Sequence, residues 1–273
     1  SAYCNAGFAL QSDSLMAYRT QPGVLLTVSA LIVVGGLGPL VVGALPALRR
    51  GRGSLQVRLV LATTAVLLVA PAFLFLALEW GGTLGDLPVH HKVVNAWFQS
   101  VTFRTAGFNS VDFGAIQPAT WTLALVCMFV GGSPGSTAGG VKTTTIAVPL
   151  LAVVAAGRGL PEANAHGRRV PHRTVYDAAA ITTVGVLVAA AAIVAIQVTQ
   201  VLPSDVAIFE VVSALGTVGL SMGGTAQLDA IGKLFILGCM FAGRVGSLTL
   251  FILLMGRARP GRHRYPIERV QVG

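Results

Sequence analysis

The sequence predicts an all-α membrane protein in which one helix, pore-loop and helix unit is used repeatedly around an axis. Hydrophobic residues make up 54% of the 273 residues and charged residues only 11%, a balance that excludes an ordinary soluble domain. Long uncharged runs alternate with short polar segments, and three of the short segments share a glycine-containing pattern. Because about 20 residues cross the ~30 Å hydrocarbon core, the chain has room for several spans but for no large soluble module.

The apolar runs predict the membrane helices. We expect helices at 21–48, 59–78, 178–204 and 230–256, each long enough to span. A further uncharged run, residues 113–141, is broken near its end by a glycine-rich stretch, and a helix resumes over residues 142–156. Glycine and proline inside such runs are tolerated where protein or a water-filled cavity covers the freed main-chain groups.

Two shorter segments are predicted to enter the membrane without crossing it. Residues 90–100 and 204–215 are too short and too polar to span, and each is followed directly by a glycine-containing stretch. They are typical of re-entrant half-helices that line a pathway. His90 and His91 begin the first of them, and the remaining histidines lie in basic loops, so no catalytic or metal cluster is expected.

The charges indicate which side of the membrane each loop faces. Of the 19 Lys and Arg residues, 13 fall in three short segments: Arg49, Arg50, Arg52 and Arg58; Arg158, Arg168, Arg169 and Arg173; Arg257, Arg259, Arg262, Arg264 and Arg269. Seven of the ten acids lie in the intervening segments: Asp13, Glu79, Asp86, Asp112, Asp205, Glu210 and Asp229. The positive-inside rule places the basic segments and the carboxyl terminus in the cytoplasm. The net charge of +9 therefore encodes orientation and not nucleic-acid binding, and the acidic outer face concentrates cations.

The three cysteines carry no special chemistry in this interpretation. Cys4, Cys127 and Cys239 are isolated from one another in or beside apolar stretches. This pattern is typical of buried small hydrophobic residues and predicts neither a disulfide framework nor a metal site.

Three short segments align on their glycines. They are residues 1–8 (SAYCNAGF), 101–109 (VTFRTAGFN) and 213–220 (SALGTVGL), at offsets of 100 and 112 residues. The last two each follow a long apolar run and a half-helix and precede a second apolar run, so one structural unit is repeated. A helix, pore loop and helix unit repeated around an axis is how cation channels are built. Half-helices ending at Ser100 and Leu215 would aim their partial negative ends at a cation between them.

The aligned segments have the residue types that an ion filter requires. A dehydrated cation needs a cage of oxygens, and an extended segment directs successive carbonyl groups inward only with unusual backbone angles and little bulk near the axis. We therefore expect the backbone carbonyls of the following residues to bind potassium: Asn5, Ala6 and Gly7; Thr105, Ala106 and Gly107; Thr217, Val218 and Gly219. Potassium at these carbonyls is the one metal ion expected, and no cofactor is expected.

The glycine-rich interruption and a nearby arginine are the candidate gate. Its residues are Gly132, Ser133, Pro134, Gly135, Ser136, Thr137, Ala138, Gly139 and Gly140, followed by Lys142. The stretch differs from a phosphate-binding P-loop because Val141 separates the second glycine from the lysine and no buried strand precedes it. Arg244 interrupts an apolar run between Gly243 and Gly246, where a charge is costly and is expected to face a cavity. A flexible kink for the glycines, and snorkelling for Lys142 and Arg244, are the simpler alternatives.

Taken together, these segments resemble the Trk/Ktr/HKT superfamily of potassium- and sodium-translocating subunits, and most closely its Ktr type. The carriers are NAGF at 5–8, RTAGFN at 104–109, GGSPGSTAGGVKT at 131–143, GTVGLS at 216–221 and GRVG at 243–246. The resemblance implies four pore units arranged pseudo-fourfold in one chain, gated by residues 132–140 and Arg244. This sequence shows three filter segments, so one unit is expected to be incomplete and one absent, as in the carboxyl-terminal part of a longer subunit.

The resemblance also implies an organisation and partners. The expected divisions are a filter segment and second helix of pore unit 2 (1–55), pore unit 3 (56–173), pore unit 4 (174–256) and a cytoplasmic tail (257–273). In the resembled family the tail lies at a homodimer interface and a cytosolic ring of nucleotide-binding subunits docks on the basic loops. The implied function is channel-like potassium uptake across the cytoplasmic membrane, with sodium dependence left open, and no enzyme activity.

Three alternatives stay open at this point. A sodium-permeable member of the same superfamily differs at the first filter segment, which this sequence does not contain. The potassium-binding subunit of an ion-pumping ATPase has a related pore, although the tail from Tyr265 to Gly273 argues against it. A membrane scaffold or receptor would need no repeated filter segments.

Overall fold

The computed structural model describes residues 1–50 and 53–246, and nearly all of its regular structure is helical. In chain order the elements are η1 (Met16–Tyr18), α1 (Pro22–Arg49), α2 (Leu55–Leu78), α3 (Val89–Thr102), η2 (Phe113–Ala115), α4 (Pro118–Phe129), α5 (Thr143–Gly157), β1 (Asn164–Ala165), β2 (Arg168–Arg169), α6 (His172–Thr199), α7 (Ser204–Gly216), α8 (Gly224–Gln227) and α9 (Ala230–Val245). The two strands form an antiparallel hairpin that pairs Asn164 with Arg169 and Ala165 with Arg168. The expected all-α class is confirmed.

Helices α1, α2 and α6 are long and apolar enough to cross a membrane, and α4 and α5 are shorter apolar helices. The bounds of α1 and α5 agree with the predicted ones to within one residue, whereas α2 begins at Leu55, four residues early, and contains Arg58, and α4 begins five residues into the predicted run. The largest difference is at α6. This helix begins at His172 and ends at Thr199, whereas the sequence predicted 178–204. Arg173, assigned to a basic loop, therefore lies in the first turn of α6, because Pro171 at the N-cap starts the helix before the apolar run begins.

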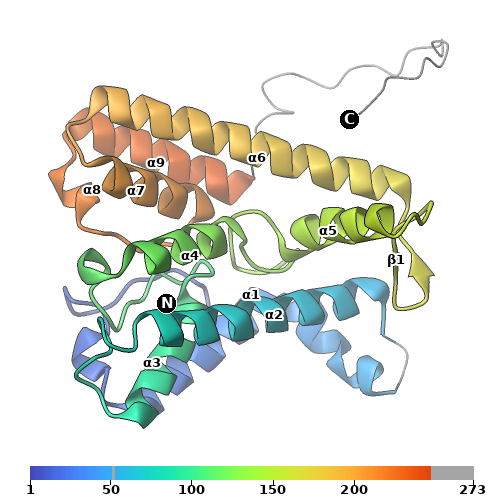
Figure 1. Ribbon diagram of the computed structural model, residues 1–273, viewed down its shortest axis with the longest axis horizontal. Helices are drawn as coiled ribbons and strands as arrows, with labels where there is room; N and C mark the ends of the chain where they lie inside the picture. Colours follow the sequence, from blue (N-terminus) through green and yellow to red (C-terminus); the bar gives the residue numbers. More distant parts are fainter. Residues whose placement is uncertain (51–52, 247–273) are drawn as a thin grey trace.

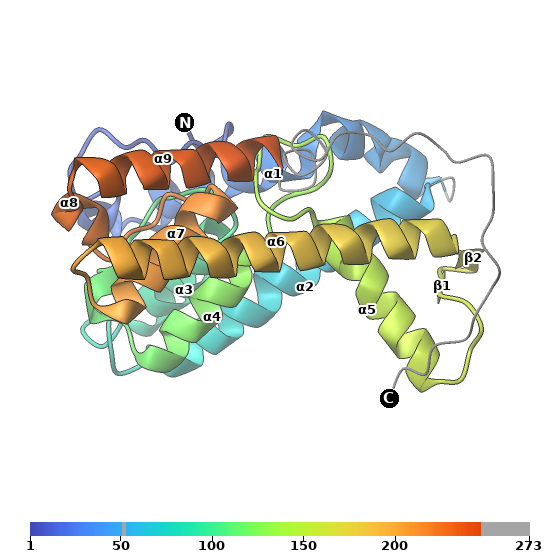
Figure 2. The same ribbon diagram turned by 90° about the horizontal axis from the view of Figure 1, so that it is seen from above.

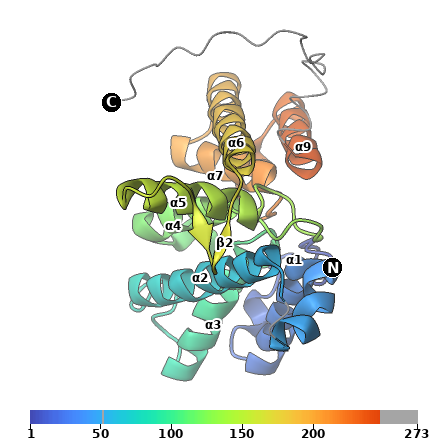
Figure 3. The same ribbon diagram turned by 90° about the vertical axis from the view of Figure 1, so that its right-hand side faces the viewer.

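The long helices are arranged in layers along the long axis of the molecule (Figure 1). α6, α7 and α9 form one layer, α4 and α5 the next, and α1, α2 and α3 the far side; the end-on view shows the same order (Figure 3). Seen from above, α6 runs from the β1–β2 hairpin to α7 (Figure 2). The α1–α2 turn and the hairpin lie at one end, and the α2–α3 loop and α8 lie at the other. Segments predicted to be basic and acidic are thus separated along the long axis.

Local chemistry fixes the helix ends. The Ser54 side chain accepts a hydrogen bond from the Val57 N–H at the start of α2, and Asp229 accepts one from the Gly232 N–H at the start of α9. Between α4 and α5 lies the α4–α5 loop, residues 130–142, whose two ends are joined by a parallel bridge between Val130 and Val141. The predicted interruption and the helix that follows it are confirmed.

Helix α1 contains a break that the sequence interpretation missed. Gly38 has φ 76° and ψ 160°, which no helical residue adopts, and Pro39 follows it. A Cβ atom at Gly38 would lie 2.9 Å from the Cα of Ser136, so the α4–α5 loop passes directly against the break.

A chain of aromatic rings forms the core beside the half-helices. Phe103 packs against Phe75 and Phe113 with ring centroids 5.9 and 6.0 Å apart, and Phe113 lies 5.8 Å from Phe209. These four rings come from the two predicted repeats and the loops between them, so burying them holds the repeats together. Cys127 in α4 and Cys239 in α9 are buried as predicted, but Cys4, which lies in a turn and not in a helix, is exposed.

Part of the predicted chain lies outside the described residues. Helix α9 ends at Val245, and Gly246 has φ 94°. The remainder of the predicted last span, the tail 257–273 and six basic residues fall outside the described ranges: Arg52, Arg257, Arg259, Arg262, Arg264 and Arg269. The predicted division into pore units stays a prediction.

Candidate functional site

The three aligned segments share one backbone conformation. In each, a residue and the glycine two positions later have positive φ, and the residue between them does not: Asn5 (49°) and Gly7 (71°), Thr105 (66°) and Gly107 (77°), Thr217 (52°) and Gly219 (88°). Positive φ is uncommon for residues other than glycine, so its recurrence at three asparagine or threonine positions is not accidental. Alternating conformations of this kind direct successive carbonyl groups to the same side of a segment. We call Asn5–Gly7, Thr105–Gly107 and Thr217–Gly219 the filter segments.

The filter segments meet at their glycines. A Cβ atom at Gly107 would lie 2.6 Å from the carbonyl oxygen of Val218, 3.2 Å from the Cα of Gly7 and 3.3 Å from the Cα of Gly219. A Cβ atom at Gly7 would lie 2.8 Å from the carbonyl oxygen of Ala106. Segments 100 and 112 residues apart in sequence therefore bring main-chain oxygens to a single place that admits no side chain.

The half-helices α3 and α7 end at the filter segments, at the end of the molecule that also holds α8 (Figure 2). A hydroxyl near the end of each helix bonds to the carbonyl that follows the filter glycine. Thr102 Oγ1 donates to the Phe108 oxygen at 2.6 Å, and Ser213 Oγ donates to the Leu220 oxygen at 2.6 Å. The carboxyl ends of both helix dipoles thus face the converging segments, which favours a cation there.

These two hydroxyl groups were not predicted as functional residues. Their sequence signal is a Ser or Thr five to six residues before each filter glycine, and it is visible only once the half-helices are aligned on their last turn. Each hydroxyl group holds the residue that follows the filter glycine at a fixed position relative to the end of its own half-helix.

Two carboxylates that were predicted to face outward are buried instead. Glu210 accepts hydrogen bonds from Ser221 Oγ, the main-chain N–H groups of Met222 and Gly224, and Thr225 Oγ1 at 2.5 to 3.1 Å. It ties α7 to the chain that leaves the third filter segment. The expectation that Glu210 adds to an exposed acidic face is wrong, because four donors bind its oxygens inside the protein.

Glu79 plays the corresponding part after α2, one residue beyond the span. It is fully buried and accepts from Thr83 N and Oγ1, Gln117 N and Thr120 Oγ1 at 2.6 to 3.0 Å. Burial alone raises the pKa of Glu79, but the hydrogen bonds from Thr120, Gln117 and Thr83 outweigh it, and the pKa lies below its ordinary value of 4.5. Glu79 therefore stays ionised and is also withdrawn from the exposed acidic face.

Arg104 links the second filter segment to the α4–α5 loop. Its side chain is buried directly before Thr105, and Nη2 donates to the carbonyl oxygen of Gly131 at 3.1 Å. Gly131 is confined at this point, because a Cβ atom there would lie 1.8 Å from the Gly139 oxygen. The start of the α4–α5 loop is thereby attached to the residue that directly precedes the second filter segment.

The α4–α5 loop lies against two of the filter regions. A Cβ atom at Gly139 would lie 2.0 Å from Thr217 Oγ1, and Thr137 Oγ1 donates to the Tyr3 oxygen at 3.2 Å. Lys142 Nζ donates to the Ala138 oxygen at 2.6 Å, so this ammonium group folds back onto its own loop and does not extend away from it. The predicted gate residues are thus brought directly beside the filter segments.

Arg244 reaches the same loop from α9. Its side chain is exposed, and Nη1 donates to the carbonyl oxygen of Thr137 at 2.5 Å. Where Arg244 sits, α9 and α7 touch closely, since a Cβ atom at Gly243 would lie 2.0 Å from the Leu215 oxygen. The geometry joins Arg244 to a carbonyl group of the glycine-rich stretch with which the sequence grouped it as the candidate gate.

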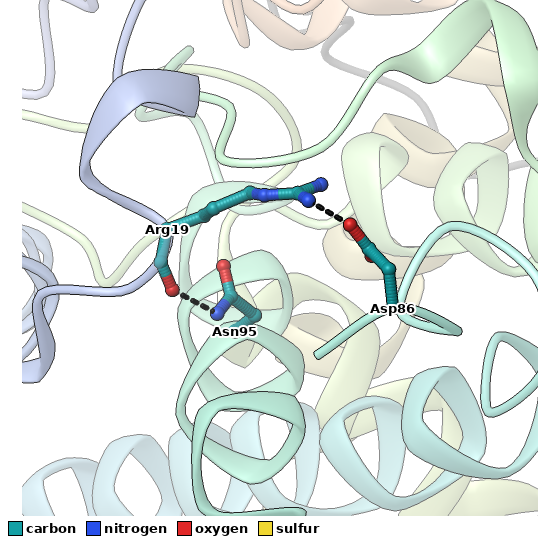
Figure 4. Close-up of polar contacts among 3 residues, drawn as sticks. All are labelled: Arg19, Asp86 and Asn95. Atoms are coloured by element: carbon teal, nitrogen blue, oxygen red, sulfur yellow. Dashed lines mark hydrogen bonds and ion pairs between the residues drawn. The ribbon is translucent and has the colours of Figure 1, made fainter. Parts of the chain in front are cut away.

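On the side of the α2–α3 loop, a separate clamp holds α3 to the start of α1. Asn95 Nδ2 donates to the Arg19 oxygen at 2.8 Å, and the Arg19 guanidinium pairs with Asp86 (Figure 4). Asn95 is fully buried, whereas the ion pair is exposed. The hydrogen bond from the Asn95 side chain to the Arg19 oxygen therefore positions the half-helix α3, and the ion pair lies on the solvent side of this bond.

Comparison with known proteins finds both a family and a fold. A family model described as TrkH, cation transport protein, matches residues 53–257. The chain is 39% identical to the potassium/sodium uptake protein NtpJ of Enterococcus hirae and 38% identical to Ktr system potassium uptake protein B of Bacillus subtilis. Both alignments cover 100% of this chain and 62% of the relative, so the chain spans less than two thirds of these relatives. The solved potassium transporter TrkH from Vibrio parahaemolyticus shares its fold, with a TM-score of 0.78 at 21% identity over 93% of this chain and 56% of that chain.

Proposed function

Because the chain belongs to the TrkH family of cation transport proteins, we propose that it carries potassium ions into the cell through its three filter segments. The single observation that supports this most is the meeting of Gly7, Gly107 and Gly219, each of which has positive φ and follows, two positions later, another residue with positive φ. Main-chain oxygens gathered where no side chain fits can replace the hydration shell of a dehydrated cation. The family transports cations, so the prediction that this chain is not an enzyme is confirmed.

The protein is a multi-pass membrane protein, and its orientation is part of the proposal. The α1–α2 turn, the first turn of α2 and the β1–β2 hairpin lie at one end of the molecule and carry Arg50, Arg58, Arg168 and Arg169. By the positive-inside rule this end faces the cytoplasm, and the carboxyl terminus does so too. A negative membrane potential then drives cations inward from the opposite end, at ~2.3 kcal/mol per charge per 100 mV.

We further propose that the α4–α5 loop is the gate. The loop contacts the region of the first filter segment at Tyr3 and that of the third at Thr217, so it lies across the route that an ion leaving the filter would take. Arg244 holds the loop through Thr137 and adds a positive charge that repels cations. Potassium passes when the loop moves away from the filter segments.

A sodium-permeable transporter is the second candidate. The relative from Enterococcus hirae is named a potassium/sodium uptake protein, so sodium permeation is the alternative to potassium selectivity. Sodium dependence of potassium uptake is a separate part of the proposal. Each of the three filter segments of this chain contains the glycine that keeps the oxygen cage free of side chains, as a potassium filter requires, whereas the segment expected to separate the two candidates lies outside this sequence. Competition between the two ions distinguishes the candidates.

The proposed assembly is a homodimer in membrane lipid with a cytosolic ring of nucleotide-binding subunits. The basic loops offer the docking surface, since Arg158, Arg168 and Arg169 are exposed at the predicted cytoplasmic end. The tail that the resemblance places at the dimer interface lies outside the described residues.

Growth of cells that lack other potassium uptake systems tests the function. The full-length protein containing this chain is expected to restore growth at low external potassium and to take up rubidium, a potassium congener. Expression at the membrane without restored growth or uptake would contradict the proposal. Restored uptake that sodium abolishes by competition would favour the sodium-permeable alternative.

A further inference from the structure

The break in α1 leaves three consecutive carbonyl groups without helical partners. In an α-helix each carbonyl accepts from the N–H four residues later. The bonds from Gly35, Gly36 and Leu37 would all have to span Gly38, whose backbone is not helical. The first of them would also end on Pro39, which has no N–H. These three oxygens therefore need donors from elsewhere in the protein.

The α4–α5 loop supplies all three donors. The N–H of Thr137 bonds to the Gly35 oxygen at 3.4 Å and the N–H of Ser133 to the Gly36 oxygen at 3.0 Å. The Oγ of Ser133 donates to the Leu37 oxygen. Ser133 is fully buried, so water does not compete for these bonds.

Thr137 then joins α1 to α9 through the loop. Its N–H bonds to α1, its Oγ1 donates to Tyr3 and its carbonyl accepts from Arg244. Every polar group of Thr137 is thus engaged by a different part of the chain. The loop is held from two sides, by α9 through one cation and by α1 through freed main-chain oxygens.

We propose that the break at Gly38 and Pro39 is the seat of the gate, and that Ser133 is the positioning residue that holds the α4–α5 loop in it. This inference rests on the proposed gating function and assigns the second attachment point of the gate. Opening then requires the loop to leave α1 as well as Arg244, and three oxygens of α1 become free to face the permeating ion or water. Helix α1 is an active part of the gate and not only a membrane span.

The test measures potassium flux into liposomes that contain the full-length protein with Ser133→Ala. Losing a hydrogen bond that exists only in the closed state is expected to raise the flux roughly fivefold. Ser29→Ala is the matched control, because Ser29 is a buried serine on α1, the helix that contains the break, and its hydroxyl finds no partner among the described residues. The ratio of potassium to sodium flux is expected to stay at the wild-type value, which a general loosening of the fold would not preserve.

Pro39→Ala tests the seat without altering the loop. It restores a main-chain N–H at position 39, so that α1 can straighten through Gly38 and bond the Gly35 oxygen itself. This alternative competes with the N–H of Thr137 and is expected to raise the flux as well. Pro39→Ala also decides the matter if Ser133→Ala does not fold. Combined with Arg244→Gln, each variant is expected to raise the flux above that of either single change. A departure from the product of the two single effects measures their coupling, because both attachments meet at Thr137.

The outcomes separate the seat from the gate. If Arg244→Gln raises the flux while Ser133→Ala and Pro39→Ala match wild type, the seat on α1 is wrong and the gate stands. If none of the three variants raises the flux, the α4–α5 loop is not the gate. A Ser29→Ala variant as leaky as Ser133→Ala would overturn the assignment to Ser133.

Discussion

A Cβ atom added to Gly107 would lie 2.6 Å from the carbonyl oxygen of Val218, a residue 111 positions further along the chain. Real Cβ atoms do not approach an oxygen this closely, so Gly107 allows two distant segments to place their carbonyl groups together. The positive φ of 77° makes the same demand independently. Both constraints follow from the repeat that the sequence displays.

Gly107→Ser is expected to reduce discrimination between potassium and sodium. The new side chain displaces the Val218 oxygen and distorts the cage, so the ratio of potassium to sodium uptake should fall roughly tenfold, equivalent to ~1.4 kcal/mol of differential binding. Gly43→Ser in α1 is the control, because a Cβ atom there meets no atom within 4 Å. If sodium competes with potassium uptake equally in Gly107→Ser and in wild type, the filter segments do not select between the two ions.

Arg244→Gln is expected to increase potassium flux. The change removes the charge beside the α4–α5 loop and weakens its bond to Thr137, and a hydrogen bond from a charged donor accounts for roughly tenfold or more in the closed-to-open ratio. The flux is measured in liposomes at a fixed membrane potential. Arg173→Gln on the exposed first turn of α6 should behave like wild type, and a flux in Arg244→Gln at or below wild type would refute the gate.

Glu79 makes the stability of the protein dependent on pH. Its pKa is lower in the folded than in the unfolded protein, so its stabilisation is fully present above the ordinary value of 4.5 and is lost as the pH falls through the lower, folded value. The melting temperature of the protein in detergent should therefore drop below about pH 4.5.

Glu79→Gln removes that dependence and tests its origin. The variant should be less stable at pH 7 by about 2 kcal/mol, because buried donors lose a charged acceptor, and its melting temperature should change less between pH 6 and pH 3.5. Asp205→Asn removes an exposed carboxylate on α7 and serves as the control. Equal pH profiles for wild type and Glu79→Gln would assign the acid sensitivity to other groups.

The clamp in Figure 4 separates a buried hydrogen bond from an exposed ion pair. Asn95→Ala removes both bonds of Nδ2, to the oxygens of Arg19 and His91, and is expected to cost about 2 kcal/mol of unfolding free energy. Arg19→Gln breaks only the exposed pair with Asp86 and should cost less than about 1 kcal/mol. Denaturation of the two variants in detergent gives both values, and a larger loss for Arg19→Gln would reverse the assigned roles.

Much of the fold could be predicted because the membrane restricts the choices. Apolar runs longer than about 20 residues become spans, and the two half-helices are recognised by being too short and too polar to cross. The predicted half-helices appear as α3 and α7 with ends shifted by one or two residues. The filter glycines were found because a repeat exposes positions where backbone geometry, and not side-chain chemistry, is conserved within the chain.

The break in α1 could not be predicted by the same reasoning, although its signal is present. Residues 35–39 read GGLGP and residues 131–135 read GGSPG. The break inside α1 therefore has a sequence similar to that of the interruption between α4 and α5. A hydropathy scale scores both segments as apolar, and the presence of glycine and proline does not indicate whether a membrane helix bends or breaks there. Only the position of the α4–α5 loop against Gly38 distinguishes the two.

The buried carboxylates were misplaced for a related reason. Glu79 lies at the end of α2 and Glu210 lies within α7, both in polar segments between apolar runs, where charge counting assigns them to the outer face. Their partners, such as Thr120 and Thr225, are 41 and 15 residues away and are hydroxyl and main-chain groups without charge. Hydrogen bonding of this kind leaves no pattern in a single sequence.

The reversal potential with potassium on one side of a bilayer and sodium on the other tests the central claim most directly. The full-length protein, made conductive by Arg244→Gln, is placed between equal concentrations of the two ions. If the filter segments form a potassium cage, the current reverses at a potential far from zero, with the potassium side negative, and Gly107→Ser moves it toward zero. A reversal at zero for Arg244→Gln alone would contradict the claim.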